Sequence, residues 1–141
     1  NVFGPRQDPN GAYAAVIPLF FKHAFQNTSP TINGDGSITR DYTYVANVVK
    51  ANLNALFAES WEGHEVFNVA CGATTTLNEL WQLIKRLTGS HAEAIHGPNR
   101  SGDILHSLAD VRKAARLIDY FSLTSLQEGL ELANVWYSKI K

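Results

Sequence analysis

The sequence predicts an α/β fold that contains more helix than strand. Apolar residues recur at helical spacing in several segments, and short runs that favour strands stand between glycine-rich loops. The 141 residues, 45% of them apolar, are enough to build one globular domain. The predicted strands are few for an isolated α/β domain, so we expect some of them to belong to a sheet whose other strands are missing from this chain.

The first half of the chain contains two segments with helical character and one predicted strand. Residues 12–26 favour a helix, in which Pro18 is expected to cause a kink or to start a second helical segment. Residues 45–60 are predicted to form an amphipathic helix because their apolar side chains recur at i, i+3 and i+4. Residues 65–70 favour a buried strand. The apolar stripe of the second helix consists of Val45, Val48, Val49, Leu53, Leu56 and Phe57.

Two capping boxes mark the starts of helices in the second half of the chain. In each box a hydroxyl residue stands three positions before a glutamate, Thr76 before Glu79 and Ser125 before Glu128. Apolar residues at helical spacing follow both boxes, and a shorter helix is expected over 110–118. The two stripes consist of Leu77, Leu80, Trp81, Ile84 and Leu87, and of Leu126, Leu130, Ala133, Trp136 and Ile140.

The composition excludes several classes of function. Twelve basic and thirteen acidic residues give a net charge of −1, which supplies no attractive field for nucleic acid or for an anionic membrane. The longest apolar run, residues 12–21, contains Pro18 and is too short to span a bilayer. Cys71 is the single cysteine, which excludes an intrachain disulfide and leads us to expect a reducing, cytoplasmic location. We expect its thiol to be buried and inert.

Each of three glycine-rich loops contains one arginine. The loops cover residues 4–11, 33–41 and 97–103, and their arginines are Arg6, Arg40 and Arg100. A guanidinium forms paired hydrogen bonds with phosphate oxygens, so a diphosphate is a suitable ligand for two of them. The alternative is that each arginine bonds to a neighbouring carboxylate or carbonyl and holds its own loop. The other arginines, which we expect to face solvent from helices, are Arg86, Arg112 and Arg116.

Other motifs do not predict a complete catalytic site. Gly34-x-Gly36 lacks the third glycine of the dinucleotide-binding fingerprint and is interpreted as a turn. Tyr137 and Lys141 have the spacing in which a lysine lowers the pKa of a tyrosine, but we expect this helix end to be solvated. We expect no metal site, because metal-ligand spacing is absent from the five histidines, His23, His64, His91, His96 and His106.

Five strings of residues carry a resemblance to a known family. They are NVFGPRQDPNGAYAAVIP at 1–18, INGDG at 32–36, RDYTYV at 40–45, VFNVA at 66–70 and RSGDILHSLAD at 100–110. Together they resemble the NAD-dependent epimerase/dehydratase family of extended short-chain dehydrogenase/reductases, and within it the bacterial UDP-N-acetylglucosamine 4-epimerases. Because the chain also begins without Met or a signal-peptide pattern, we expect it to be a fragment of a longer protein.

The resemblance implies that residues 1–141 are the C-terminal, UDP-sugar-binding domain of such an enzyme. The Rossmann-type N-terminal half, which would bind NAD and contain the catalytic tyrosine and lysine, would then be missing. Residues 65–70 would supply the last strand of the absent Rossmann sheet. The parent enzyme would be a homodimer that interconverts UDP-GlcNAc and UDP-GalNAc through transient NAD-mediated oxidation at C4. We expect the fragment alone to have no epimerase activity.

The resemblance also assigns substrate-binding roles to seven positions. In the order of the ligand's parts, they are Asn1, Arg40 and Arg100 for the diphosphate, Asp103 for the ribose, the backbone of Ala15 for uracil, and Gln7 and Ser107 beside the sugar. The small side chain of Ser107 would leave room for an N-acetyl group. Thr31 and Ala46 depart from the family pattern, which bears on the base and on the sugar preference. A dehydratase or decarboxylase of the same family, and a non-catalytic nucleotide-sugar-binding module, are the alternatives.

Overall fold

The computed structural model describes residues 1–10, 15–58 and 63–139. Within these ranges the helices are α1 (Val16–Gln26), α2 (Val45–Phe57), α3 (Leu77–Thr88), α4 (Arg112–Ile118) and α5 (Leu126–Tyr137). The strands are β1 (Val2–Phe3), β2 (Thr31–Asn33), β3 (Thr39–Arg40), β4 (Thr43–Tyr44), β5 (Thr75–Thr76) and β6 (Ile95–Gly97). The α/β class predicted from the sequence is confirmed, with more helix than strand.

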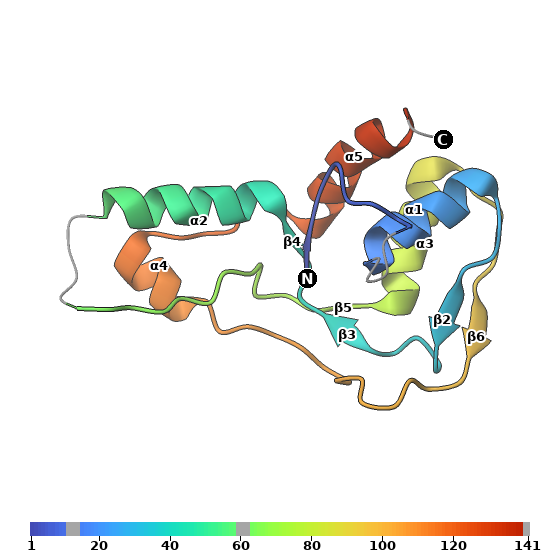
Figure 1. The fold of residues 1–141 in the computed structure, drawn as a ribbon, viewed down its shortest axis with the longest axis horizontal. Coiled ribbons are helices and arrows are strands. Elements are labelled where there is room, and N and C mark those ends of the chain that lie inside the picture. Colours follow the sequence, from blue (N-terminus) through green and yellow to red (C-terminus); the bar gives the residue numbers. More distant parts are fainter. Residues whose placement is uncertain (11–14, 59–62, 140–141) are drawn as a thin grey trace.

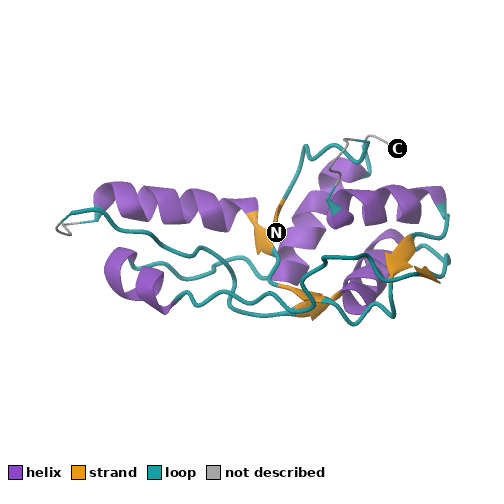
Figure 2. Ribbon diagram, turned by 60° about the horizontal axis from the view of Figure 1, so that its bottom comes forward, coloured by secondary structure: helices purple, strands orange, loops and turns teal. Residues whose placement is uncertain are grey.

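The elements divide into a helical core and an arm (Figure 1). The helical core contains α1, α3 and α5, which contact one another. The arm contains α2 and α4 together with the segments 63–71 and 119–124. Helix α2 begins directly after β4, whereas loops precede and follow α4 (Figure 2). Within the described ranges, no helix has both the length and the apolar character that a membrane crossing requires.

Aromatic and aliphatic side chains fill the centre of the helical core. Trp81 and Phe20 meet edge to face with their ring centroids 5.4 Å apart, and Leu80, Ile84 and Leu130 are fully buried beside them. Pro18 lies in the first turn of α1, where the missing N–H removes no helical hydrogen bond. The prediction of a kink or a second helical segment at this residue is therefore wrong. The part of the predicted helix over 12–14 lies outside the described residues.

The strands form three separate pairs among the described residues. β1 pairs in parallel with β4, β2 pairs in parallel with β6, and β3 pairs with β5 in the antiparallel sense. Strand β3 lies inside the segment 33–41, for which only a loop was predicted. Thr39 of this strand also forms a parallel bridge with His106. These pairings join segments that are more than 30 residues apart in sequence, such as Ile32 with His96.

The predicted buried strand over 65–70 is not formed in this chain. This segment is extended but lacks strand pairing in the described structure, and Val66 is 70% exposed. Side chains bind it to the neighbouring segments: the Asn68 amide donates to the Asp110 carbonyl, the Tyr120 hydroxyl donates to the Ala70 carbonyl, and Lys113 pairs with Glu65. A strand-favouring segment becomes a strand only where another strand offers hydrogen-bonding groups.

Helix α2 confirms the predicted helix, but its apolar stripe does not face a core. The helix ends at Phe57, and positions 59–60 of the prediction lie outside the described residues. Leu56 and Phe57 are 73% and 77% exposed, whereas the buried residues of α2 are Asn47 and Ala51. Helical periodicity identifies the stripe, but it does not say whether this chain supplies the surface that covers it.

Both predicted capping boxes are present. The Thr76 hydroxyl accepts from the Glu79 N–H while the Glu79 carboxylate accepts from the Thr76 N–H, and Ser125 and Glu128 repeat the arrangement. The hydrogen bonds to these two glutamates lower the pKa of each carboxyl. The short helix is confirmed as α4. The last stripe position, Ile140, lies outside the described residues.

The end of α5 differs from the expectation of a solvated helix terminus. Tyr137 is 3% exposed and stacks on Phe21 with ring centroids 4.8 Å apart. Its hydroxyl donates to the Gly4 carbonyl at 3.2 Å, and burial raises its pKa to about 12. A phenol held in this way favours its protonated state, the opposite of what a catalytic base needs. Lys141 lies outside the described residues.

Candidate functional site

Four of the predicted site residues line one cavity, which we call the arginine cavity. Asn1, Arg40, Arg100 and Asp103 surround a volume of about 310 Å³, with α1 and β2 forming the opposite wall. These four residues come from three separate places in the sequence. The structure therefore brings together two of the three loop arginines, an amide and a carboxylate, which is a set of groups that can bind an anionic ligand with hydroxyl groups.

Strand pairing positions the first two of these residues. The carbonyl oxygen of Asn1 accepts a hydrogen bond from the Thr43 N–H at 3.1 Å, which extends the β1–β4 pair to the start of the chain. Arg40 lies three residues before Thr43 and ends β3. Its Nη1 donates to the carbonyl oxygens of Thr39 and Ile104, at 2.9 and 2.6 Å. One end of the guanidinium thus fixes the loop, as the alternative interpretation predicted, while the same residue lines the cavity.

The segment that contains Arg100 and Asp103 is held at both ends. The β2–β6 pair fixes the residues before it, and the bridge between Thr39 and His106 fixes those after it. The segment turns between these two residues, and the Asp103 N–H donates to the Arg100 carbonyl at 3.3 Å. Gly102 has a φ of 84°, a conformation that L side chains rarely adopt. The loop can therefore present Arg100, which is exposed, at the cavity mouth.

His23 of α1 also lines the arginine cavity. Burial lowers its pKa below the ordinary value, and the nearby charge of Lys22 lowers it further. One ring nitrogen, Nδ1, lies 2.9 Å from the Thr28 hydroxyl. The imidazole is thus neutral at neutral pH, and the positive charges available to a ligand in this cavity are those of the two arginines.

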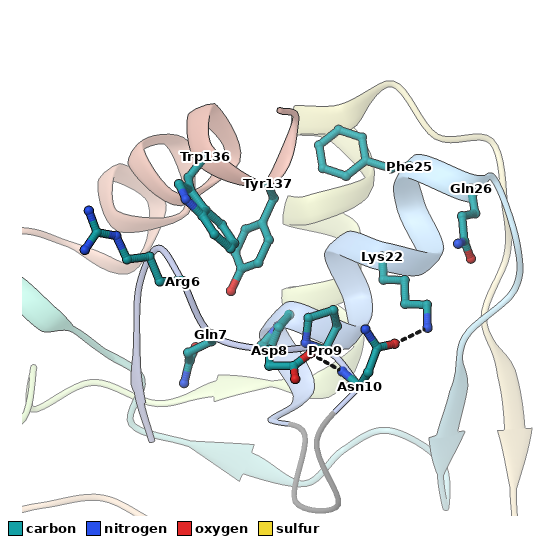
Figure 3. A pocket seen from close by; sticks show the side chains of 11 residues that line it. Arg6, Gln7, Asp8, Pro9, Asn10, Lys22, Phe25, Gln26, Trp136 and Tyr137 are labelled. Carbon is teal, nitrogen blue, oxygen red and sulfur yellow. Dashed lines mark hydrogen bonds between the residues drawn. The ribbon is translucent and has the colours of Figure 1, made fainter. Parts of the chain in front are cut away.

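Arg6 and Gln7 line a different and larger cavity of about 610 Å³ (Figure 3). Its walls are mainly apolar and aromatic, from Phe25 of α1 and Trp136 and Tyr137 of α5. The Gln7 amide donates to the Val2 carbonyl at 3.1 Å and so ties this loop to β1. The third loop arginine is therefore not among the residues that line the arginine cavity. The apolar lining makes this larger space a poor match for a diphosphate.

Ala15 and Ser107 lie beside the arginine cavity and not in its wall. Ala15 is the residue before α1 and lines a smaller cavity of about 220 Å³ that shares Asn1 and Tyr42 with the arginine cavity. Ser107 is half-buried, and its N–H donates to the Thr39 carbonyl next to Arg40. Of the two departures from the family pattern, Thr31 lines the arginine cavity and Ala46 is exposed on α2.

Tyr42 is the site residue that the sequence analysis missed. It lines the arginine cavity and the smaller cavity next to it, and it is 4% exposed. Burial raises the pKa of its phenol to about 12, against the opposing effect of the Arg40 charge. Its place in the string RDYTYV, two residues after Arg40, was a signal, because alternate residues of an extended segment point to the same side.

The other predicted features have simple structural roles. Arg86, Arg112 and Arg116 are exposed, as predicted, and Arg112 pairs with Asp110. Cys71 is half-buried and not fully buried as expected. Its sulfur accepts hydrogen bonds from the Ser122 hydroxyl at 3.1 Å and from the Asn47 amide at 3.8 Å. Gly34 and Gly36 occupy a turn with φ of 67° and 76°, in agreement with the interpretation as a turn.

Comparison with known proteins identifies the family. The model of the NAD dependent epimerase/dehydratase family matches residues 1–70. The UDP-glucose 4-epimerase of Thermotoga maritima, solved with UDP-glucose, is 40% identical and has a TM-score of 0.92 over 99% of this chain and 44% of its own. The UDP-N-acetylglucosamine 4-epimerase of Methanobrevibacter ruminantium M1, solved with UDP-N-acetylmuramic acid, is 36% identical with a TM-score of 0.86 over 100% of this chain and 44% of its own.

Further relatives extend the range of named activities and show the cofactor. The UDP-glucose 4-epimerase of Thermus thermophilus, solved with NAD, is 30% identical over 97% of this chain and 44% of its own, with a TM-score of 0.84. The UDP-N-acetyl-alpha-D-glucosaminuronate decarboxylase of Bacillus cytotoxicus is 31% identical over 147 aligned residues, which cover 100% of this chain and 45% of that protein.

The fold is that of the C-terminal part of an extended short-chain dehydrogenase/reductase. The chain belongs to the NAD-dependent epimerase/dehydratase family, as its resemblance indicated. It spans less than half the length of the relatives and solved structures that it matches.

Proposed function

We propose that this chain is the substrate-binding part of a NAD-dependent UDP-sugar 4-epimerase. The observation that carries the proposal is the arginine cavity, which Arg40 and Arg100 both line although 60 positions separate them in the sequence. Two guanidinium groups beside an amide and a carboxylate match the oxygens and hydroxyls of a nucleoside diphosphate sugar. Three of the relatives named above are 4-epimerases of UDP-sugars, which supports the same reaction class.

In this proposal the chain holds the nucleotide and leaves the sugar free to turn. Arg40 and Arg100 offset the charges of the diphosphate with Asn1, and Asp103 accepts a hydrogen bond from the ribose. The backbone of Ala15 contacts uracil, while Gln7 and Ser107 stand beside the hexose. Binding energy from the nucleotide thus holds the substrate in place while the hexose stays free to rotate. Inversion at C4 requires this rotation, because both faces of the sugar must be presented in turn.

The Gly34-x-Gly36 turn lacks the third glycine of the dinucleotide fingerprint, and it packs against Asn78, whose amide donates to the Asp35 carbonyl. We therefore assign NAD binding and the catalytic tyrosine and lysine to the rest of a parent protein, which acts in the cytoplasm as a homodimer. NAD bound there supplies oxidation at C4 and the return of the hydride. The chain alone is expected to show no turnover with NAD and UDP-GlcNAc.

The same proposal assigns a partner surface to the arm. The exposed apolar face of α2, the exposed Val66 and the exposed Phe121 and Leu123 lie on the arm. We assign this face to contact with the cofactor-binding half, with residues 65–70 adding the last strand to its sheet. A helix with an exposed apolar stripe next to other exposed apolar side chains points to a surface that is covered in the complete protein.

For the sugar, we propose UDP-GlcNAc and UDP-GalNAc. The basis is the small side chain of Ser107, which leaves room for an N-acetyl group. A bulky side chain at this position would exclude that group, and steric exclusion discriminates more strongly than a pocket that is only partly filled. The Methanobrevibacter ruminantium relative supports this choice, whereas the Thermotoga maritima relative is named for UDP-glucose. The ratio of kcat/KM for UDP-GlcNAc and UDP-glucose, measured in the parent enzyme with Ser107 and with Ser107→Tyr, tests the assignment. The serine enzyme is expected to use both sugars, and the tyrosine variant to lose the N-acetylated one selectively.

A decarboxylase of the same family is the second candidate, because the Bacillus cytotoxicus relative covers the whole chain at 31% identity. The two reactions give different products. An epimerase converts UDP-GlcNAc into its C4 epimer, whereas a decarboxylase requires a uronic acid and releases carbon dioxide. A non-catalytic nucleotide-sugar-binding module would bind UDP-GlcNAc without forming either product in the parent protein.

Calorimetric titration of the chain with UDP and UDP-GlcNAc tests the binding site. Arg100→Ala is the informative variant, since Arg100 is exposed and its loss does not disturb packing. Binding is expected to weaken at least about tenfold, as the loss of a charge-assisted hydrogen bond implies. Arg86→Ala, which removes the same charge from an exposed position on α3, is the matched control and is expected to bind as the original chain does. The assignment would be contradicted if both variants weakened binding equally, or if neither variant weakened it.

A further inference from the structure

The larger cavity, of about 610 Å³, lies between the loop 6–10 and helices α1 and α5, and we call it the aromatic cavity. In the described part of the chain it shares no lining residue with the arginine cavity. Helix α1 contributes to both, with Lys22 and Phe25 lining the aromatic cavity and Phe20 and His23 lining the arginine cavity. Small-molecule sites enclose about 300–1,000 Å³, so the aromatic cavity has the size of a separate binding site.

A row of four aromatic rings forms the apolar part of this cavity. Phe25 stacks on Phe21 with ring centroids 6.1 Å apart, Phe21 stacks on Tyr137 at 4.8 Å, and Tyr137 meets Trp136 edge to face at 4.9 Å. The middle rings, Phe21 and Tyr137, are buried, whereas Phe25 and Trp136 at the two ends are half-buried and line the cavity. Rings at such positions favour contact with another flat apolar group.

Lys22 supplies a positive charge to the aromatic cavity. Its ammonium donates to the side-chain oxygen of Asn10, a neutral acceptor, at 2.7 Å. In the described part of the chain it forms no ion pair with a carboxylate, whereas Lys85 and Lys113 each pair with a glutamate. The Asp8 carboxylate lines the same cavity and accepts from the Asn10 N–H at 2.8 Å. An ammonium group has three donors, so Lys22 can bond to an anionic group without breaking an ion pair.

The walls of the aromatic cavity are tied together before any ligand arrives. The Tyr137 hydroxyl donates to the Gly4 carbonyl and joins α5 to the loop, and the bond from Lys22 to Asn10 joins α1 to it. Arg6 has a φ of 72°, where Figure 3 shows the loop bending toward α1 and the Arg6 side chain pointing away from Lys22. A ligand therefore meets a cavity whose walls it does not have to order, which lowers the cost of binding.

We propose that the aromatic cavity is a second binding site, whose ligand is a flat aromatic acid. Figure 3 shows Trp136 and Tyr137 on one side of the cavity and Phe25 and Lys22 on the other. The ring of the ligand lies against the half-buried rings, and its anionic group bonds to the Lys22 ammonium. The apolar walls provide affinity for any flat ring, whereas the lysine selects an acid over a neutral compound of the same shape. This site does not depend on the proposed function.

Calorimetric titration with 1-naphthoate, an aromatic acid, and with the neutral 1-naphthalenemethanol tests the site. The chain is expected to bind 1-naphthoate more tightly. Lys22→Met, which keeps an apolar side chain of similar length, is expected to weaken 1-naphthoate about tenfold and to leave 1-naphthalenemethanol unchanged, because only the acid loses a charge-assisted hydrogen bond. Trp136→Ala is expected to weaken both compounds, since it removes part of the wall that the ring contacts. Lys22→Met leaves the aromatic row intact, so it tests the site independently of any loss of folding in Trp136→Ala.

Lys50→Met is the matched control, because it removes the same charge from an exposed position on α2 and should leave the affinity for 1-naphthoate unchanged. Leu56→Ser together with Phe57→Ser tests whether the compounds bind to the exposed apolar residues of the arm, and it should leave both affinities unchanged. The inference is overturned if neither compound binds, if Lys22→Met binds 1-naphthoate like the original chain, or if the arm variant loses the binding.

The same titrations separate this site from the arginine cavity. Arg100→Ala is expected to bind 1-naphthoate as the original chain does, and Lys22→Met is expected to leave UDP affinity unchanged. Displacement of 1-naphthoate by UDP, or its loss in Arg100→Ala, would place the compound in the arginine cavity and overturn the inference. If 1-naphthoate binds as expected while neither the chain nor the parent protein binds UDP, the second site stands and the proposed function fails.

Discussion

The helical core and the arm are stabilised in different ways. The core buries large apolar side chains against one another, and Phe21, Leu80, Ile84 and Leu130 have no exposed surface. The arm buries a smaller cluster, which consists of Ala51, Ala114, Ile118 and Tyr120, and leaves many of its large apolar side chains in contact with solvent. The large apolar side chains of the core are thus covered by other parts of the same chain, whereas many of those of the arm are not.

A buried polar residue holds parts of the arm together. Asn47 of α2 is 1% exposed, and its amide donates to the Ser122 hydroxyl and the Thr124 carbonyl while its oxygen accepts from the N–H groups of Leu123 and Thr124. Every polar atom of the side chain is engaged, which is the condition under which burying an amide is favourable. Directed hydrogen bonds can fix the orientation of a helix without using its apolar face, and that face stays available for another surface.

The largest expected effect is in the helical core. Trp81→Ala removes a side chain that is 1% exposed and packs on Phe20, so it should lower the free energy of unfolding by about 3–5 kcal/mol. Urea unfolding followed by circular dichroism measures the loss. Phe57→Ala removes a similarly large aromatic side chain from the arm, where it is 77% exposed, and is expected to change stability by no more than about 0.5 kcal/mol. Similar losses for the two variants would contradict the distinction between the regions.

Asn47→Ala should have the next largest effect and should act on the arm. It leaves the backbone N–H groups of Leu123 and Thr124 without their acceptor, and the expected loss is about 2–3 kcal/mol. Hydrogen exchange of α2 measured along the chain should show faster exchange in the arm than in the core. Asn52→Ala is the control, since Asn52 is exposed on the same helix and bonds only to Val48 of its own helix. A loss spread evenly over both regions would show that they unfold as one unit.

Ser125→Ala tests the capping box of α5 and should have a smaller effect. The substitution removes the acceptor for the Glu128 N–H, and a loss of about 1 kcal/mol is expected from thermal unfolding. Thr76→Ala in the equivalent box of α3 should give a similar value. Ser138→Ala changes a hydroxyl at the other end of α5 that bonds to a carbonyl of the helix itself, and it should have less effect. Equal effects at both ends would show that the box does not contribute specifically.

The smallest effect on stability is expected from replacing the apolar face of the arm. Leu56→Ser together with Phe57→Ser should change the free energy of unfolding by no more than about 0.5 kcal/mol, because both side chains are exposed. The same change should reduce self-association of the chain in sedimentation experiments, since exposed apolar patches drive association. A large loss of stability would show that the chain itself covers this face.

Much of the local structure could be predicted from short stretches of sequence. The two capping boxes, the helices they begin and the turn at Gly34-x-Gly36 depend on residues within three or four positions of one another. The prediction of a kink at Pro18 failed within this range, because the position of the proline in the helix matters more than its presence. Helix α2 was also predicted, but the environment of its apolar stripe was not.

The sequence predicted which types of residue form the candidate site, but not which of them line the same cavity. Arg40 and Arg100 stood out as arginines of glycine-rich loops, but so did Arg6, which lines a different cavity. The place of Tyr42 two residues after Arg40 was a signal, but the sequence does not show whether its side chain reaches the same cavity.

The sequence by itself determined which residues form helices and turns, where two helices begin, and which family the chain resembles. Only the tertiary structure decided which two arginines share a cavity, that residues 65–70 form no strand with the described part of this chain, and that the apolar face of the arm is exposed. The reason is the range of the forces involved. Capping and periodicity act over a few residues, whereas the pairing of β2 with β6 and the bridge from Thr39 to His106 join distant segments and so create the site.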